Sequence, residues 1–271
     1  TTYTVASDPT GMACTVTSTA KSGAYQLTTV YSTDPARDSV LLHTIFTPLT
    51  KAASRYQVYV RLDATVAGNG GGGSGNGGAD SATVDTSTGH LVPVSFDTNT
   101  STNAVNRDYA VPTYLALRAD RPFSAVSSGF VGTSSDGLTE LDATHTLAPT
   151  YTDATSGNVE QTAQIDTSRS RTFTLALGFG TTQRQAVQTA SASVQHSYSA
   201  SVKSYELGWA AYDRALRRPS SQLSGLTRSQ SAQADKAYYI SANVVKASED
   251  KTFPGAIVAS LASPWGQAVS A

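Results

Sequence analysis

Few side chains in this sequence could carry acid–base chemistry. Its four glutamates are Glu140, Glu160, Glu206 and Glu249. Glu249 is followed directly by Asp250, and carboxyl groups often serve as general acids and bases. A general acid and a general base that act with a water molecule between them must lie ~6.5–9.5 Å apart, on either side of the bond that is cleaved. Two carboxyl groups at adjacent positions cannot take up this arrangement. We therefore expect Glu249 and Asp250 to lie at the end of a helix, where Lys246 and Lys251 offset their unfavourable interaction with the helix dipole.

The remaining reactive residues form no known catalytic or metal-binding pattern. The histidines show neither H-x-H nor H-E-x-x-H spacing; they are His43, His90, His145 and His196. The sequence therefore predicts no metal site and no cofactor. Cys14 is the single cysteine, so it cannot form an internal disulfide, and we expect it to be buried or available for an intermolecular link. No residue is assigned a catalytic role.

A run of glycines from Gly68 to Gly78 contains a formal G-x-G-x-x-G match at Gly68, Gly70 and Gly73. A dinucleotide site needs such a turn between a strand and a helix, because the N-terminus of the helix holds the pyrophosphate. No helical pattern follows this run. We expect a surface loop here.

The overall charge and hydropathy exclude some classes of partner. Nineteen basic and 20 acidic residues give a formal net charge of −1, which provides no basic surface for nucleic acid. No apolar run reaches the ~20 residues that span a bilayer, and no basic-plus-apolar leader opens the chain. Only 14% of the residues are charged. We expect an extracellular protein whose export signal has already been removed.

The elements that would position these residues are mainly strands in the first two-thirds of the chain. From Tyr25 to Tyr31 large and polar side chains alternate, which is the period of a half-buried strand. Similar runs predict strands at 25–31, 39–47, 56–66, 91–96, 109–117, 123–131, 158–165 and 171–179. The first three are expected to form a meander. So many antiparallel strands indicate a sandwich or a barrel, and we expect a large antiparallel β-sandwich over residues 1–180.

After residue 180 the hydrophobic period lengthens to steps of three and four. One stripe runs through Val187, Ala190, Val194, Tyr198, Val202, Tyr205, Trp209, Tyr212 and Leu216. It predicts a single long helix that starts at a cap formed by Thr181 or Thr182. The aromatic members could stack on a sugar, but their helical spacing favours packing against the sheet, with Trp209 buried. Residues 181–226 are thus expected to form a linker helix and a polar connection, and a second helix to span about 227–248.

The segment from Lys246 to Ser260 reads KASEDKTFPGAIVAS. It resembles the K-A-x-E-D-K-T-[FY]-P-G-A-x-V-A-S turn at the start of the catalytic barrel in glycoside hydrolase family 15, the glucoamylases and glucodextranases. Residues 33–41 (TDPARDSVL) and 129–137 (GFVGTSSDG) are similar to stretches in the N-terminal β-sandwich of the bacterial members. Residues 177–180 (LGFG), followed by Ala186 to Ala190, look like the strand and linker helix that close that sandwich.

The resemblance implies part of a secreted, exo-acting, inverting α-glucoside hydrolase that releases glucose from dextran or starch-type α-glucans without a cofactor. The family's W-x-R-D substrate-binding motif and its two catalytic glutamates have no counterpart in these 271 residues, so the chain is expected to be inactive by itself. The resemblance assigns residues 227–271 to the first helix and turn of a truncated (α/α)6 barrel. It also places Trp265 near the sugar, as the one substrate-binding residue.

Two further expectations concern partners. Only 24 residues precede Tyr25, fewer than in members of the family. The sheet is therefore expected to lack its first strands and to expose an edge that pairs with the missing part of the enzyme or with a second copy. The alternative function is a non-catalytic, secreted β-sandwich that binds carbohydrate or a protein partner.

Overall fold

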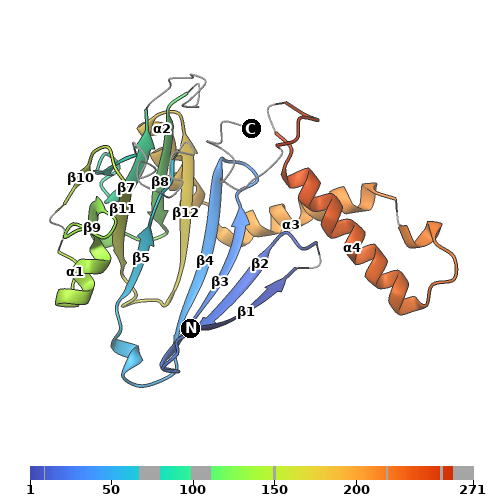
Figure 1. Ribbon diagram of the computed structural model, residues 1–271, viewed down its shortest axis with the longest axis horizontal. Helices are drawn as coiled ribbons and strands as arrows, with labels where there is room; N and C mark the ends of the chain where they lie inside the picture. The colour runs from blue at the N-terminus through green and yellow to red at the C-terminus, as the bar shows by residue number, and fades with distance from the viewer. Residues whose placement is uncertain are drawn as a thin grey trace.

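A computed structural model describes residues 1–8, 10–66, 80–98, 111–148, 151–217, 219–250 and 253–258. The fold consists of two antiparallel β-sheets, with one short helix inside the strand region of the chain and longer helices after its last strand (Figure 1). The expected mainly β, antiparallel architecture is therefore confirmed. In these ranges no helix is both long and apolar enough to cross a membrane.

The larger sheet has nine strands in the order β1-β2-β3-β4-β12-β8-β7-β6-β10. Their bounds are β1 Thr2–Ser7, β2 Cys14–Thr19, β3 Tyr25–Thr33, β4 Ser39–Pro48, β12 Thr172–Gly180, β8 Thr113–Ala119, β7 Val92–Asp97, β6 Ser81–Asp85 and β10 Asp153–Ala154. β12 lies in the middle, where Leu177 is opposite Val40 of β4 on one side and Leu117 of β8 on the other. The chain thus returns after residue 171 to fill the centre of the sheet.

The smaller sheet covers one face of the larger one. Its strands are β5 (Val58–Leu62), β11 (Val159–Ile165) and β9 (Phe123–Phe130), in that order. The core between the sheets contains residues that are at most 5% exposed, namely Leu117, Phe123, Val126, Ala163, Ile165, Phe173 and Leu175. Successive side chains of a strand point to opposite faces, so Phe173 and Leu175 enter this core whereas Ala176 points away from it.

The other face of the larger sheet is covered by α2 (Gln183–Gln195). As expected, Thr182 caps this helix, accepting a hydrogen bond from the Gln185 N–H. The helix packs through residues that are at most 1% exposed, Ala186, Val187 and Ala190, onto a second core formed by Leu41, Val92, Val94, Ala116 and Ala176. The molecule therefore has three layers: the small sheet, the large sheet and α2.

The single helix expected over 181–216 is divided in two. α2 ends at Gln195, and α3 (Tyr198–Ala215) begins after two extended residues, His196 and Ser197. The Ser197 hydroxyl caps α3 by accepting a hydrogen bond from the Ala200 N–H at 3.4 Å. Serine competes for backbone hydrogen bonds in a helix interior and is favoured at a cap, which explains the break.

The second expected helix is present as α4 (Arg228–Ala247), and it follows the 3-10 turn η2 (Pro219–Gln222). Thr227 and Gln230 form a capping box at its start, in which each side chain bonds the other residue's backbone N–H. α3 and α4 lie together at one end of the molecule, beside β1, β2 and β3 (Figure 1). The division of the chain into domains at residues 180 and 226 stays a prediction.

The path of the strands corrects the expected meander, and the structure contains elements that were not expected. β3 and β4 pair as expected, but β5, the third strand of the expected meander, lies in the smaller sheet beside β11, after the 3-10 turn η1 (Ala53–Arg55). The residues before Tyr25 form β1 and β2, and all six residues of β1 are exposed. The short helix α1 (Gly137–Thr144) was also not expected. The glycine run at 68–78 lies outside the described residues.

Candidate functional site

Two carboxylates lie together in the interior, beside a cation. Arg61 of β5 contacts both: its Nη2 is 3.3 Å from Oδ2 of Asp136, and its Nε is 3.4 Å from Oε2 of Glu160. The side chain of Glu160 is fully buried and that of Asp136 is 5% exposed. Paired carboxylates are the usual catalytic groups of glycoside-cleaving sites, so this cluster is a candidate active site.

The surroundings move the two carboxyl pKa values in opposite directions. Burial raises the pKa of Asp136, but hydrogen bonds from two backbone N–H groups and the Arg61 guanidinium outweigh it, so its pKa is lowered. Burial dominates at Glu160, whose pKa is raised. Glu160 also accepts hydrogen bonds from the Gly137 N–H at 2.6 Å and from the Thr162 hydroxyl at 2.9 Å. Divergent pKa values are typical of catalytic acid–base pairs. Whether a substrate can reach the two carboxylates therefore distinguishes a catalytic role from a structural one.

The cluster has a structural role, because a substrate cannot reach it. Glu160 has no exposed surface that a substrate could reach, and Asp136 is the N-cap of α1, accepting a hydrogen bond from the Leu138 N–H at 2.9 Å. The cluster fastens the start of α1 to β5 and β11. Two glycines of GFVGTSSDG are closely packed: a Cβ on Gly129 would lie 1.9 Å from the Ser135 carbonyl oxygen, and one on Gly137 would lie 2.5 Å from the Thr162 Cβ.

The carboxylates at the end of α4 form a turn. Glu249 accepts hydrogen bonds from the Lys246 ammonium group and from the Gly255 N–H, and both lower its pKa. Asp250 accepts one from the Phe253 N–H at 3.0 Å. These bonds fold residues 253–258 back beside 248–250, where Glu249 and Ile257 form a β-bridge. The pair thus stands at a helix end.

Trp265, the predicted sugar-binding residue, lies outside the described residues, so its placement stays a prediction. Lys251, the second cation expected beside the carboxylate pair, also lies outside them. No group of three or more His, Cys, Asp or Glu side chains is placed to hold a metal in the part of the chain that the structure describes.

The aromatic stripe of α3 lines a groove of about 710 Å³ between α3 and the end of α4. Trp209 meets Tyr205 and Tyr212 edge to face, with ring centroids 6.2 and 6.1 Å apart. The Tyr205 hydroxyl donates to the Met12 carbonyl at 2.9 Å, which ties α3 to the loop before β2. Trp209 is only half-buried, so the expectation of a buried Trp209 is wrong. One side of the stripe faces the groove rather than the sheet.

Comparison with known proteins identifies this architecture. Residues 1–214 match the family model described as "Glucodextranase, domain N". The chain belongs to the glucodextranase N-domain family. Over 248 residues it is 26% identical to a glucoamylase of Clostridium sp. (strain G0005), an alignment that covers 92% of this chain and 31% of that protein. The resemblance to glucoamylases and glucodextranases found in the sequence is thereby confirmed.

Solved structures show the same fold as this glucodextranase N domain. A crystal structure of a bacterial glucoamylase complexed with acarbose matches with a TM-score of 0.79 and 24% identity, over 98% of this chain and 35% of that one. A family GH92 inverting mannosidase from Bacteroides thetaiotaomicron matches with a TM-score of 0.54 and 14% identity, over 85% of this chain and 25% of that one. The chain spans about a third of the length of the glucoamylases it matches.

The other two family-like stretches of the N domain hold α2 in place. Asp34 of TDPARDSVL is 2% exposed and accepts hydrogen bonds at 2.9 Å from both the Ser193 hydroxyl of α2 and the Arg37 guanidinium. A Cβ on Gly178 of LGFG would lie 2.4 Å from the Ala190 nitrogen and 2.7 Å from the Ala186 carbonyl oxygen. These stretches therefore serve packing rather than catalysis.

Proposed function

We propose that this N domain is the N-terminal part of a secreted, exo-acting, inverting α-glucoside hydrolase that releases glucose from dextran or starch-type α-glucans. The observation that supports this most is the family match over residues 1–214, together with the likeness to a glucoamylase structure over 98% of the chain. In an inverting reaction one carboxylic acid protonates the leaving oxygen and one carboxylate activates water. Both carboxyl groups would come from a catalytic domain that follows this chain.

The role of the chain itself would be to support that domain. Five apolar side chains of α4 and the turn after it, Val244, Val245, Phe253, Ile257 and Val258, are between 47% and 67% exposed. We call them the α4 patch. Apolar clusters on a surface mark sites that another protein surface covers. The α4 patch adjoins the end of the Trp209 groove, since Lys246, Ala247 and Glu249 line that groove, and we expect the catalytic domain to pack on both.

A pair of matched substitutions tests this contact in the longer protein, by which we mean this chain together with the proposed catalytic domain. Ile257→Asp places a charge in the α4 patch, where burial against the catalytic domain would make it costly. Leu138→Asp on α1 is the control, because Leu138 is 50% exposed and Ile257 is 57% exposed. Ile257→Asp should lower the unfolding midpoint of the longer protein and leave that of the 271-residue chain unchanged. Equal effects of the two substitutions in the longer protein would contradict the contact.

The reaction is tested by its product. The longer protein should release β-glucose from maltoheptaose or from isomaltooligosaccharides, because inversion at an α-linked carbon gives the β anomer, and proton NMR of the first product distinguishes the anomers. Initial release of α-glucose would contradict inversion, and release of internal oligosaccharides would contradict exo-action. The absence of any hydrolysis would favour the alternative, a non-catalytic protein that binds carbohydrate or another protein.

A further inference from the structure

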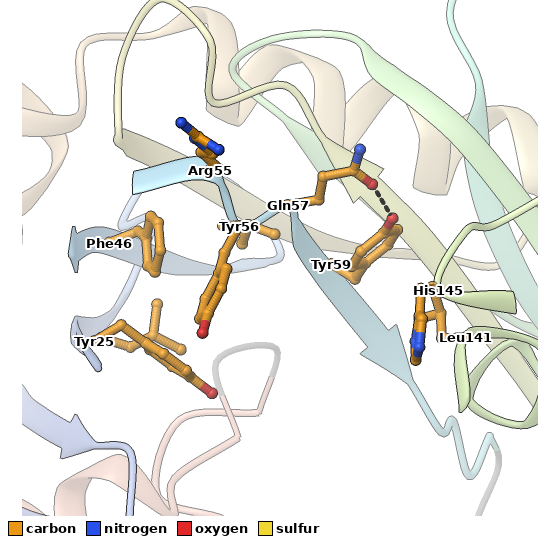
Figure 2. A pocket seen from close by; sticks show the side chains of 10 residues that line it. Tyr25, Phe46, Arg55, Tyr56, Gln57, Tyr59, Leu141 and His145 are labelled. Carbon is orange, nitrogen blue, oxygen red and sulfur yellow. Dashed lines mark hydrogen bonds between the residues drawn. The ribbon is translucent and has the colours of Figure 1, made fainter. Parts of the chain in front are cut away.

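A pocket of about 530 Å³ opens where the chain crosses from the larger sheet to the smaller one. Its lining comes from the start of β3 and the end of β4, from the segment that joins η1 to β5 and the first residues of β5, and from α1 with the residue that follows it. Figure 2 shows Tyr25, Phe46 and Tyr56 gathered on one side of this pocket, and Tyr59, Leu141 and His145 on the other. The volume lies within the ~300–1,000 Å³ of ordinary small-ligand sites.

The aromatic side of the pocket forms a corner with an apolar floor. Tyr25 lies 5.8 Å from Phe46 and 6.0 Å from Tyr56 between ring centroids, and the Tyr25 and Tyr56 rings are nearly perpendicular at 79°. Phe46 is only 3% exposed, whereas Tyr56 is 46% exposed. The tyrosine rings offer an apolar face and a polar hydroxyl group at one edge. A sugar ring has matching chemistry, with a face of C–H groups and hydroxyls at its rim.

The polar side chains around the pocket suit a neutral, hydroxyl-rich ligand. The Tyr59 hydroxyl donates to Oε1 of Gln57, which holds both groups at the pocket wall, and Arg55 adds further donors. Among the described residues that line the pocket there is no carboxylate, and Arg55 is the one Lys or Arg. This mixture of apolar surface with a few donors and acceptors is the usual composition of a ligand site.

His145 occupies a backbone position at which glycine is favoured. It follows α1 with φ 57° and ψ 17°, and its N–H bonds the Leu141 carbonyl oxygen. The left-handed conformation is uncommon for any residue with a side chain, and glycine is the usual choice at such a helix end. An imidazole is present at this position instead, and it lines the pocket.

We infer that this pocket is a binding site for a short α-glucan segment, held by stacking on Tyr56 and Tyr25 and by hydrogen bonds from Gln57 and His145. The choice of an α-glucan rests on the proposed function, whereas the inference that the ligand is a sugar rests on the residues that line the pocket. The site would retain the polysaccharide near the enzyme without taking part in bond cleavage.

Calorimetric titration of the 271-residue chain with maltoheptaose, isomaltoheptaose and cellohexaose tests the inference. The α-linked oligosaccharides should bind and the β-linked cellohexaose should not, and the two α-linked arms show whether the site accepts starch-type or dextran-type chains. Tyr56→Ala should weaken binding about tenfold, as loss of an aromatic anchor does. Tyr151→Ala is the matched control, since Tyr151 is 38% exposed and lies outside the pocket lining.

His145→Gly separates binding from folding. It relieves the left-handed backbone, so its unfolding midpoint should equal or exceed that of the parent chain, yet it should weaken glucan binding. The inference is overturned by the absence of binding to either α-linked oligosaccharide, by equal binding of cellohexaose, or by binding that Tyr56→Ala and His145→Gly leave unchanged. Such results would not contradict the proposed hydrolase function, because hydrolysis is measured separately, as glucose released by the longer protein.

Discussion

Arg61→Ala should destabilise this domain by about 2–4 kcal/mol, because it leaves two buried carboxylates with no cation between them. Breaking a fully buried ion pair from one side costs ~3–5 kcal/mol. The Arg61 side chain is 30% exposed, so water partly screens the site and shifts the expected cost below that range, to about 2–4 kcal/mol. Denaturant unfolding at pH 7, followed by far-ultraviolet circular dichroism, measures the loss.

The pH dependence identifies the cause of this loss. Burial already raises the pKa of Glu160 in the folded state, and removal of Arg61 should raise it further. When the pKa of a carboxyl group is higher in the folded than in the unfolded state, the group destabilises the fold at pH values above its unfolded pKa. The penalty disappears at pH values low enough to protonate the group in both the folded and the unfolded chain. The stability difference between the parent chain and Arg61→Ala should therefore shrink as the pH falls from 7 towards 4.

Two further variants complete this experiment. Combining Arg61→Met with Glu160→Gln removes two of the three charges and roughly keeps the side-chain volumes. Only the Asp136 carboxylate stays charged, with its two backbone N–H donors, so the double variant should recover part of the stability. Arg184→Ala is the control, because Arg184 is exposed on α2, and it should change stability by less than ~0.5 kcal/mol. A loss for Arg61→Ala as small as that of the control, or one that does not vary with pH, would refute the reasoning.

Three other predictions follow from the packing and the charges. Gly178→Ala should cost at least ~2 kcal/mol in a denaturant titration, because the added Cβ would clash with the backbone of α2. Gly208→Ala is the control: no atom lies within 4 Å of the added Cβ, so this substitution should stabilise α3 by ~0.5–1 kcal/mol. Equal effects of the two substitutions would contradict the close approach of α2 to Gly178. Burial raises the pKa of Asp80 to about 6, although the Val66 N–H opposes this, and Asp97 adds to it. Asp80→Asn should therefore be more stable than the parent at pH 8 and equal to it near pH 4; a constant difference would contradict this origin. Trp209→Ala should cost ~1–2 kcal/mol, less than the ~3–5 kcal/mol of a fully buried aromatic, and a larger loss would show that the groove is closed in solution.

The local part of the fold could be predicted from the sequence. Alternation of side chains predicted β3, β4, β7, β8, β9, β11 and β12, and the second helix expected at about 227–248 is α4. β1 and β2 were missed because their polar faces, rich in Thr and Ser, carry little hydrophobic alternation. The displacement of β5 to the smaller sheet was missed because pairing depends on β11, which lies far away in the chain.

The sites were harder to predict, because each combines distant segments. Glu160 did carry a signal, since a charged residue between the apolar positions of a buried strand requires a partner. Nothing in the local pattern, however, indicated Arg61 as that partner. The pocket combines Tyr25, Tyr56 and His145 from three separate elements. Only the left-handed backbone at His145 distinguishes it from an ordinary surface histidine, and a sequence does not display that angle.

The decisive experiment compares glucose release from maltoheptaose and isomaltooligosaccharides by the 271-residue chain and by the longer protein that includes the proposed catalytic domain. We expect no glucose above a boiled control from the 271-residue chain, whose buried Asp136–Glu160 cluster serves structure, and rapid release from the longer protein. Glucose released by the homogeneous 271-residue chain, or none released by the longer protein, would contradict the assignment of this domain to the front of an α-glucan hydrolase.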